Sequence, residues 1–416
     1  MNAPARGRVE VVSFGCRLNL VESEAMRRAA EDAGHADVVA VNTCAVTAES
    51  VRQARQAIRR ISRDNPDTKI IVSGCAAETE RARFAAMPEV SGIVGNAAKT
   101  DVEAWRDLLH GRTRESDIMR ETSARPIAAG SIEGHTRAFL AVQSGCDHRC
   151  TFCVIPYGRG PSRSIPAEIA IAQARRLVER GHKEIVLTGV DLTSWGGDLP
   201  GAPKLGSLAR ALLKATPGLR RLRLSSLDCI EADEDLFVAL AEEERFAPHL
   251  HLSLQSGDDM ILKRMKRRHM RADAVEFCAR VRKLRPDIVF GADLIAGFPT
   301  ETDAMAQNSL RLIDDCGLTH LHVFPYSPRE MTPAARMPQV AGDVRSERAR
   351  RLRDAGARAL IRHLDAQIGK RVDVLTERGG VGRAADFSLV ATPGVEAGEM
   401  IEGVVVAREG TKLRLG

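Results

Sequence analysis

Aromatic side chains are scarce in this sequence, at 4% of its 416 residues. Extended stacking of bases on aromatic rings therefore cannot dominate any binding of nucleic acid. Long hydrophobic runs are also lacking. No apolar stretch approaches the roughly 20 residues of a membrane-spanning helix, and the first residues show no apolar core of a secretion signal. We expect a cytoplasmic protein with no membrane partner.

The rest of the composition is that of a folded protein of moderate size. Apolar residues make up 44% of the chain, and its length allows two or three domains. The net charge of +6 suits a polyanionic partner, but a mildly basic enzyme without one has the same charge. There are nine cysteines. In a reducing compartment, cysteines are more often metal ligands or catalytic groups than disulfide partners.

Three cysteines recur at the same point of a repeated pattern in residues 1–111. Cys16, Cys44 and Cys75 each end a strand-like apolar run, and helical periodicity follows the first two. Alternating strands and helices predict a parallel sheet, in which the carboxyl ends of the strands share one edge. The three thiolates would then converge as a three-point cluster site. The alternative is three buried cysteines that pack as small apolar residues.

A second triad, Cys146, Cys150 and Cys153, lies within the single segment SGCDHRCTFC. Three thiolates at this spacing can hold three irons of a [4Fe–4S] cube and leave the fourth iron open. An open metal position is what a substrate-binding cluster needs. The alternative is a zinc site completed by His148, which lies in the same loop.

The pattern of strands and helices divides the rest of the chain. Residues 112–136 are polar and predicted to be a linker. Residues 137–340 contain six strand–helix units, too few for an eight-unit barrel, so we expect a partial (βα)6 barrel with function at the carboxyl ends of its strands. Residues 341–368 form a charged helix, and residues 369–416 are short strands that suggest a small all-β barrel. The overall fold class is α/β.

The motifs occur in a specific order: SFGCRLN, VNTCAVT, VSGCAAE, SGCDHRCTFC and HVFPYSPR. This series resembles the radical SAM methylthiotransferase family, over nearly the whole chain. The resemblance implies S-adenosylmethionine (SAM) and two [4Fe–4S] clusters, the second on the N-terminal triad. It also implies tRNA as partner, an electron donor such as flavodoxin or ferredoxin, and an RNA-gripping TRAM-like module at the C-terminus. It does not predict the oligomeric state.

The resemblance further implies which residues contact SAM. Phe152 matches the aromatic residue that borders SAM in that superfamily. The other contacts are expected where successive barrel strands end, at Gly189, Asp191, Ser225, Gln255 and Asp293.

Two segments, Cys16 to Asn19 and His322 to Ser327, resemble the branch that modifies N6-threonylcarbamoyladenosine next to the anticodon. The alternatives are the branches that act on isopentenyladenosine in tRNA or on a ribosomal-protein aspartate. An alternative of another class is a non-catalytic iron–sulfur electron carrier or structural zinc protein. A threonylcarbamoyl carboxylate needs a cation in its pocket. The candidates are Arg17, Arg329 and Arg336.

Other charged residues have two possible roles each. The basic run Lys263–Arg271 is expected on a helix, where it could contact phosphates or form a solvated face. Arg159 and Arg163 could anchor SAM or a substrate phosphate, or form loop ion pairs. Cys278 and Cys316 are expected in the core.

Overall fold

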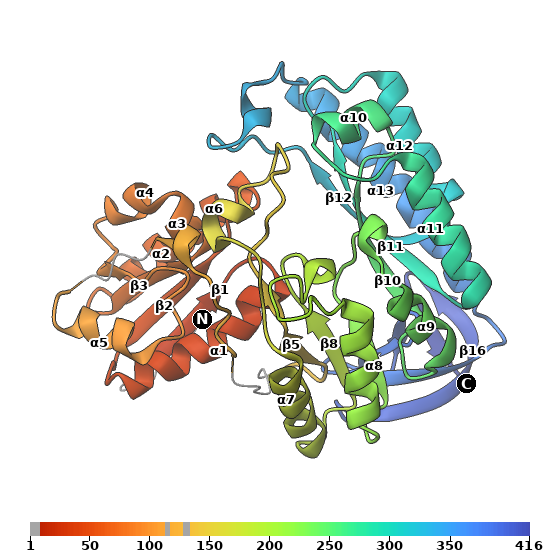
Figure 1. Cartoon of the computed structure of the whole chain (residues 1–416), viewed down its shortest axis with the longest axis horizontal. Coiled ribbons are helices and arrows are strands. Elements are labelled where there is room, and N and C mark those ends of the chain that lie inside the picture. The colour runs from red at the N-terminus through yellow and green to blue at the C-terminus, as the bar shows by residue number, and fades with distance from the viewer. Residues whose placement is uncertain (1–8, 113–116, 128–133) are drawn as a thin grey trace.

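The computed structural model describes residues 9–112, 117–127 and 134–416. Residues 113–116 and 128–133 of the predicted linker lie outside the described part. Figure 1 shows an N-terminal α/β domain in red and orange beside a central barrel in green to cyan, with a small β-barrel in violet at the lower right. No helix within the described ranges is both long and apolar enough to cross a membrane.

The N-terminal domain contains the predicted parallel sheet, in the order β1-β2-β3-β4. Its strands are β1 (Val9–Ser13), β2 (Val38–Thr43), β3 (Lys69–Gly74) and β4 (Gly92–Ile93). Its helices are α1 (Arg17–Asp32), α2 (Ala48–Asp64), α3 (Cys75–Thr79), α4 (Arg81–Ala85) and α5 (Val102–Leu109). Strand β2 is buried along its whole length, as expected for a nearly continuous apolar run in a central parallel strand.

The central domain is an open barrel of six parallel strands. They are β5 (Ala138–Ala141), β8 (Glu184–Thr188), β9 (Arg221–Leu224), β10 (His249–Gln255), β11 (Val289–Ala296) and β12 (Leu318–Pro325). They form two three-stranded halves, β5-β8-β9 and β10-β11-β12. Two parallel bridges connect the halves, one between Leu222 and Phe246 and one between Leu227 and Leu252. The partial (βα)6 barrel predicted from the sequence is confirmed.

Helices surround the barrel and enclose its largest apolar core. They are α7 (Ala167–Glu179), α8 (Leu205–Ala215), α9 (Glu234–Glu242), α11 (Arg271–Leu284), α12 (Asp303–Asp315) and α13 (Gly342–Asp365). Cys278 and Cys316 are fully buried in this core, as expected.

The last strands form a closed barrel in the order β13-β14-β15-β17-β16, which confirms the predicted all-β module. They are β13 (Arg371–Glu377), β14 (Val381–Ala384), β15 (Leu389–Ala391), β16 (Met400–Glu409) and β17 (Lys412–Leu415).

This small barrel covers the amino-terminal ends of the central strands. Arg221, the first residue of β9, donates to the Asp373 carboxylate at 2.6 Å. The ring of Phe387 stacks on His249, the first residue of β10, with 5.0 Å between centroids. Beneath them, fully buried Glu184 accepts hydrogen bonds from Arg221 and Arg223. The C-terminal module thus closes the floor of the central barrel.

Candidate functional site

The second cysteine triad lies on the loop that follows β5 and the short strand β6 (Gln143–Ser144). Strand β6 pairs with β7 (Arg163–Ser164), and the amide of Cys146 donates to the Gly160 carbonyl. Gly145 has a φ of 77°, and a β-carbon there would lie 1.7 Å from the Pro161 carbonyl oxygen. Only glycine fits this turn, which fixes the start of the cysteine loop.

The triad lines a cavity of about 150 Å³ at the carboxyl ends of the barrel strands. Phe152, Asp191 and Gln255 line the same cavity, together with Ser226, Ser253 and Arg267. The structure therefore brings three of the predicted SAM-contacting residues together with the thiols. This is the face on which barrel enzymes place their chemistry.

The three other predicted contacts, Gly189, Ser225 and Asp293, do not line this cavity. Gly189 lies against Gln143, where a β-carbon would be 2.9 Å from the side-chain oxygen. The Ser225 carbonyl accepts a hydrogen bond from Arg17. Asp293 is bound by two histidines. Strand ends alone do not determine which side chain at each end faces the thiols.

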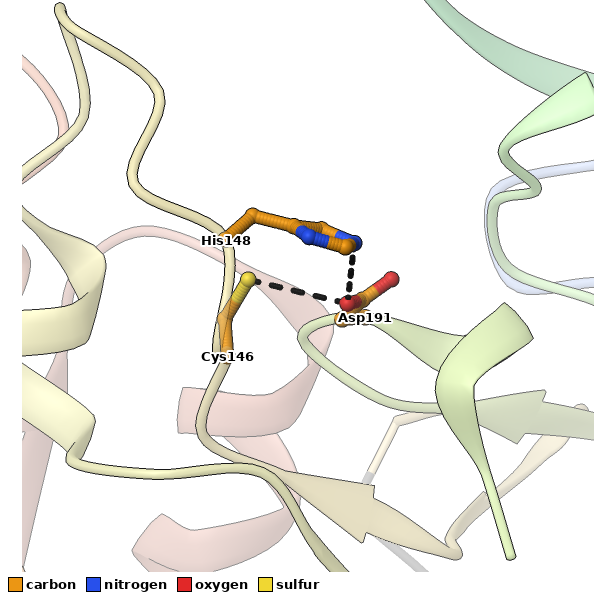
Figure 2. A group of neighbouring side chains, drawn as sticks. All are labelled: Cys146, His148 and Asp191. Atoms are coloured by element: carbon orange, nitrogen blue, oxygen red, sulfur yellow. Dashed lines mark hydrogen bonds and ion pairs between the residues drawn. The ribbon is translucent and has the colours of Figure 1, made fainter. Parts of the chain in front are cut away.

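Cys146, His148 and Asp191 form a compact group at the rim of the cavity. Figure 2 shows the cysteine and histidine side chains, both from the cysteine loop, pointing toward the aspartate after β8. The Cys146 thiol donates to the Asp191 carboxylate at 3.6 Å, and His148 Nε2 lies 2.9 Å from the same carboxylate. Their ligand atoms lie within 4.8 Å of one another, close enough to hold a metal ion.

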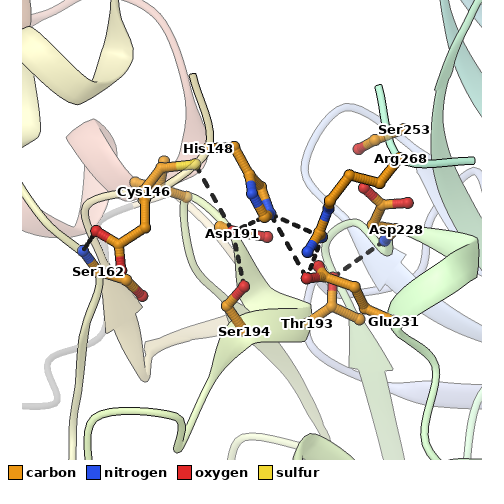
Figure 3. Close-up of polar contacts among 12 residues, drawn as sticks. Cys146, His148, Ser162, Asp191, Thr193, Ser194, Asp228, Glu231, Ser253 and Arg268 are labelled. Carbon is orange, nitrogen blue, oxygen red and sulfur yellow. Dashed lines mark hydrogen bonds and ion pairs between the residues drawn. The ribbon is translucent and has the colours of Figure 1, made fainter. Parts of the chain in front are cut away.

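The polar contacts extend from this group across the mouth of the barrel (Figure 3). His148 also lies 3.5 Å from the Glu231 carboxylate, and Glu231 pairs with Arg268. Hydrogen bonds to Asp191 and Glu231 raise the pKa of His148 to about 10. Burial raises the pKa of Cys153 to about 12. A buried thiol of this kind stays protonated unless a cation such as iron stabilises the thiolate.

The basic run Lys263–Arg271 does not form the predicted helix. Helix α10 (Asp259–Arg264) ends inside it, and Lys266 has a φ of 60°, which turns the chain. The turn directs Arg267 inward, where its guanidinium donates to Asp228 at 2.7 Å and lies 3.8 Å from the Cys150 sulfur. One cation of the run therefore faces the cysteine triad and not solvent.

The N-terminal triad lies at the carboxyl ends of β1, β2 and β3, as predicted. Cys16 precedes α1, Cys44 follows β2 and Cys75 begins α3. Gly15, with a φ of 95°, approaches Cys44 so closely that a β-carbon would lie 2.6 Å from the sulfur. Burial and the neighbouring Cys75 and Cys16 thiols together raise the pKa of Cys44 to about 11. The three thiols are thus electrostatic neighbours, although about 30 residues separate each from the next.

A buried ion-pair network lies beside this triad. Arg159 donates to Glu22 at 2.8 Å and to the Asn19 side chain at 2.6 Å, and Lys99 donates to Glu22. Burial alone would raise the pKa of Glu22, but Arg159 and Lys99 lower it to about 2. Two cations share one carboxylate next to Cys75, so the network carries a net positive charge that suits thiolates. Arg159 therefore joins the two domains, and Arg163 donates to its carbonyl.

Further contacts connect the two triads. Helix α6 (Ile155–Arg159), which follows Cys153, packs against α3, which begins with Cys75. Asn96 donates to the Gly158 carbonyl and lies 3.7 Å from the Cys75 sulfur. The helices next to the two triads are therefore in direct contact.

The three arginines predicted to meet a substrate carboxylate lie in different surroundings. Arg17 donates to the Ser225 carbonyl at 3.4 Å. Arg329 is buried and paired with Glu80, so its charge is already neutralised. Arg336 is exposed in a short 3-10 helix (Pro333–Arg336). Burial, together with Arg137 and Arg223, lowers the pKa of Arg17 to about 10.

Comparison with known proteins identifies the family. Residues 140–313 match the radical SAM superfamily, and residues 8–95 match the uncharacterized protein family UPF0004. The chain is 49% identical over 382 residues to the threonylcarbamoyladenosine tRNA methylthiotransferase MtaB of Rickettsia prowazekii, covering 91% of this chain and 90% of that protein. The chain belongs to the radical SAM methylthiotransferase family. It is an enzyme of that family, and the family implies a [4Fe–4S] cluster and SAM.

Two further similarities concern another branch of the family and the fold. The tRNA-2-methylthio-N(6)-dimethylallyladenosine synthase of Erythrobacter litoralis is 35% identical, over 89% of this chain and 86% of that protein. Among solved structures, the radical SAM methyltransferase TsrM of Kitasatospora setae has a TM-score of 0.57 at 16% identity, over 80% of this chain and 77% of that one. The likeness to TsrM is one of fold.

The barrel triad fits the cluster that the family implies. Its three thiols come from one short loop and border an open cavity, and Arg267 supplies a cation beside Cys150. The sequence alone singles out neither Lys99 nor Glu22, and it marks Arg267 only as part of the basic run. The histidines around Asp293 were also missed, although His-x-His occurs on both β10 and β12 and could have signalled them.

Proposed function

We propose that the protein converts N6-threonylcarbamoyladenosine next to the tRNA anticodon to its 2-methylthio derivative, with one [4Fe–4S] cluster on each cysteine triad. The observation that carries this proposal is the contact between the helices next to the two triads, α3 and α6. A substrate base at the mouth of the barrel would lie within reach of both. The name of the R. prowazekii relative supports the choice of substrate.

When bound, SAM and the clusters supply the radical chemistry and the methylthio sulfur, and the chain supplies position and environment. Phe152 lies against Phe298, with ring centroids 6.4 Å apart, and forms an apolar wall beside the cavity. Asp191 and Gln255 place polar oxygens at the strand ends, where they can accept hydrogen bonds from SAM. Arg267 and the Glu22 network hold positive charge next to the thiols of the two sites.

The protein is expected to act with tRNA, SAM and a low-potential electron donor such as flavodoxin or ferredoxin. The test offers cluster-loaded enzyme tRNAs carrying either threonylcarbamoyl- or isopentenyladenosine, with SAM, reductant and sulfide, and analyses the nucleosides by mass spectrometry. We expect methylthiolation of the threonylcarbamoyl form alone. Modification of only the isopentenyl form would assign the enzyme to the dimethylallyladenosine branch.

A further inference from the structure

Arg17 connects the surroundings of the two triads. It follows Cys16 directly in the chain and begins α1. Its guanidinium reaches the central barrel and donates to the carbonyl of Ser225, whose neighbour Ser226 lines the cavity of the barrel triad. Arg17 thus extends from the N-terminal triad to the edge of the cavity of the barrel triad.

Arg17 differs from three other arginines that face the inside of this part of the molecule. Arg159 pairs with Glu22, Arg221 with Glu184, and Arg267 with Asp228. Within the described residues, Arg17 has no carboxylate within 4.0 Å, and its hydrogen bond is to a neutral carbonyl. The two charged groups that act most strongly on Arg17 are the guanidinium groups of Arg137 and Arg223. The two carboxylates that act on Arg17, Asp293 and Glu184, form no ion pair with it within the described residues, so this position favours an anionic ligand.

A polar side chain on β12 contacts a carboxylate that also acts on Arg17. His322 has 55% of its side chain exposed, and its Nδ1 lies 3.2 Å from the Asp293 carboxylate. His251 Nε2 binds the same oxygen at 2.9 Å, and Asp293 also acts electrostatically on Arg17. With Nδ1–H directed at Asp293, the other nitrogen of a neutral His322 is an acceptor. The positive charge of Arg17, which acts on Asp293, disfavours a metal cation at this group, although its three side chains lie close enough for one.

Resting on the proposed function, we propose that Arg17 binds the carboxylate of the threonylcarbamoyl group and that His322 accepts a hydrogen bond from its hydroxyl. The planar guanidinium suits a carboxylate because it can donate two parallel hydrogen bonds. An isopentenyl group offers neither partner and would leave Arg17 buried and unpaired. This subsite therefore selects the substrate branch.

The test is a double-mutant cycle between enzyme and substrate. Cluster-loaded wild type, Arg17→Gln and Arg336→Gln are titrated with anticodon stem-loops that carry threonylcarbamoyladenosine or its methyl ester, and affinity is read by fluorescence anisotropy. We expect esterification to weaken binding to wild type about tenfold or more, as for a lost charge-assisted hydrogen bond. Binding to Arg17→Gln should change by less than about twofold, because the partner of the carboxylate is already gone.

Arg336→Gln is the matched control, since it removes an exposed arginine that the sequence also predicts as a partner of the carboxylate. It should keep the full sensitivity to esterification. A second pair, His322→Phe with a substrate whose hydroxyl is replaced by hydrogen, tests the hydroxyl contact in the same way. Iron content and Tm equal to wild type establish that each variant is folded.

Two outcomes separate this proposal from the one on which it rests. If wild type methylthiolates the threonylcarbamoyl substrate but Arg17→Gln remains as sensitive to esterification as wild type, the carboxylate subsite lies elsewhere and the proposed function stands. If wild type modifies only the isopentenyl substrate, the proposed function fails and the Arg17 subsite fails with it.

Discussion

Gly158 lies against Cys75 so closely that a β-carbon on the glycine would be 3.1 Å from the carbonyl oxygen of the cysteine. Gly158 belongs to α6, five residues after Cys153 of the barrel triad, and Cys75 belongs to the N-terminal triad. A methyl group at Gly158 would thus require Cys75 to shift by a few tenths of an ångström, which would change the spacing of the two triads.

Gly158→Ala should reduce methylthiolation of the tRNA but leave the cleavage of SAM intact. The added methyl overpacks a buried contact, which typically costs about 1–3 kcal/mol, and displaces the N-terminal triad. We expect methylthiolation to fall about tenfold to a hundredfold, while release of 5′-deoxyadenosine from SAM continues. Gly197→Ala is the control, because its β-carbon would make only an ordinary contact with Ser194. Equal loss of both products would show that the contact serves folding alone.

Replacing Cys146, Cys150 and Cys153 with alanine should remove about half of the iron. Two cubes on two triads predict about eight irons in protein reconstituted without oxygen, and about four in the variant. Iron, sulfide and zinc analysis of both proteins checks this. Zinc in the wild-type site, bound through His148 and Asp191, would contradict the cluster assignment.

The N-terminal triad should be dispensable for SAM cleavage. A Cys16, Cys44, Cys75 triple alanine variant keeps the barrel triad and its cavity, so it should still release 5′-deoxyadenosine under reduction. It should give no methylthiolated tRNA. The measurement is chromatography of both products in one reaction. A folded variant that releases no 5′-deoxyadenosine would overturn this division of labour.

The positions of the cysteines could be predicted because parallel strands place their carboxyl ends on one edge. That rule depends on the strand pattern alone, so it located Cys16, Cys44 and Cys75 together despite their separation in the chain. No such rule locates Lys99 or Glu22, which meet over a separation of 77 residues. Arg267 was indistinguishable from its neighbours because only the turn at Lys266, a non-glycine residue with positive φ, directs it inward.

The exposed cations of the C-terminal barrel should contribute to tRNA binding. Deleting the module would also remove Asp373 from buried Arg221, so point variants are the better test. Replacing Lys412 and Arg414 of β17 with alanine should weaken tRNA binding and reduce its salt dependence by about one unit of log–log slope per lost phosphate contact. Arg175 and Arg176 on α7 are the matched control. Unchanged affinity of the β17 variant for tRNA would show that other residues bind the tRNA.

Glu184→Gln should destabilise the floor of the central barrel by about 3–5 kcal/mol, because it leaves two buried arginines without their shared carboxylate. Burial alone would raise the pKa of Glu184, but Arg223 and Arg221 lower it to about 2. A depressed pKa adds stability above the unfolded value of 4.5 that is lost as the pH falls toward 2. The difference in Tm between the variant and wild type should therefore be constant from pH 8 to 5 and shrink below that.

The exposed pair Arg350–Asp354 provides the comparison for Glu184. Asp354→Asn should change Tm little at any pH, since both partners are solvated. If it lowered Tm as much as Glu184→Gln, burial would not be the cause of the effect.

The floor of the central barrel has a consequence for the order of folding. Arg221 and His249 belong to the middle of the chain, but Asp373 and Phe387, which cover them, are added to the chain later. During synthesis, the barrel strands emerge with polar and aromatic side chains that have no partners yet. The catalytic barrel can reach its final packing only when the C-terminal strands follow. A nascent chain that stops short of β13 therefore leaves the barrel open at its floor.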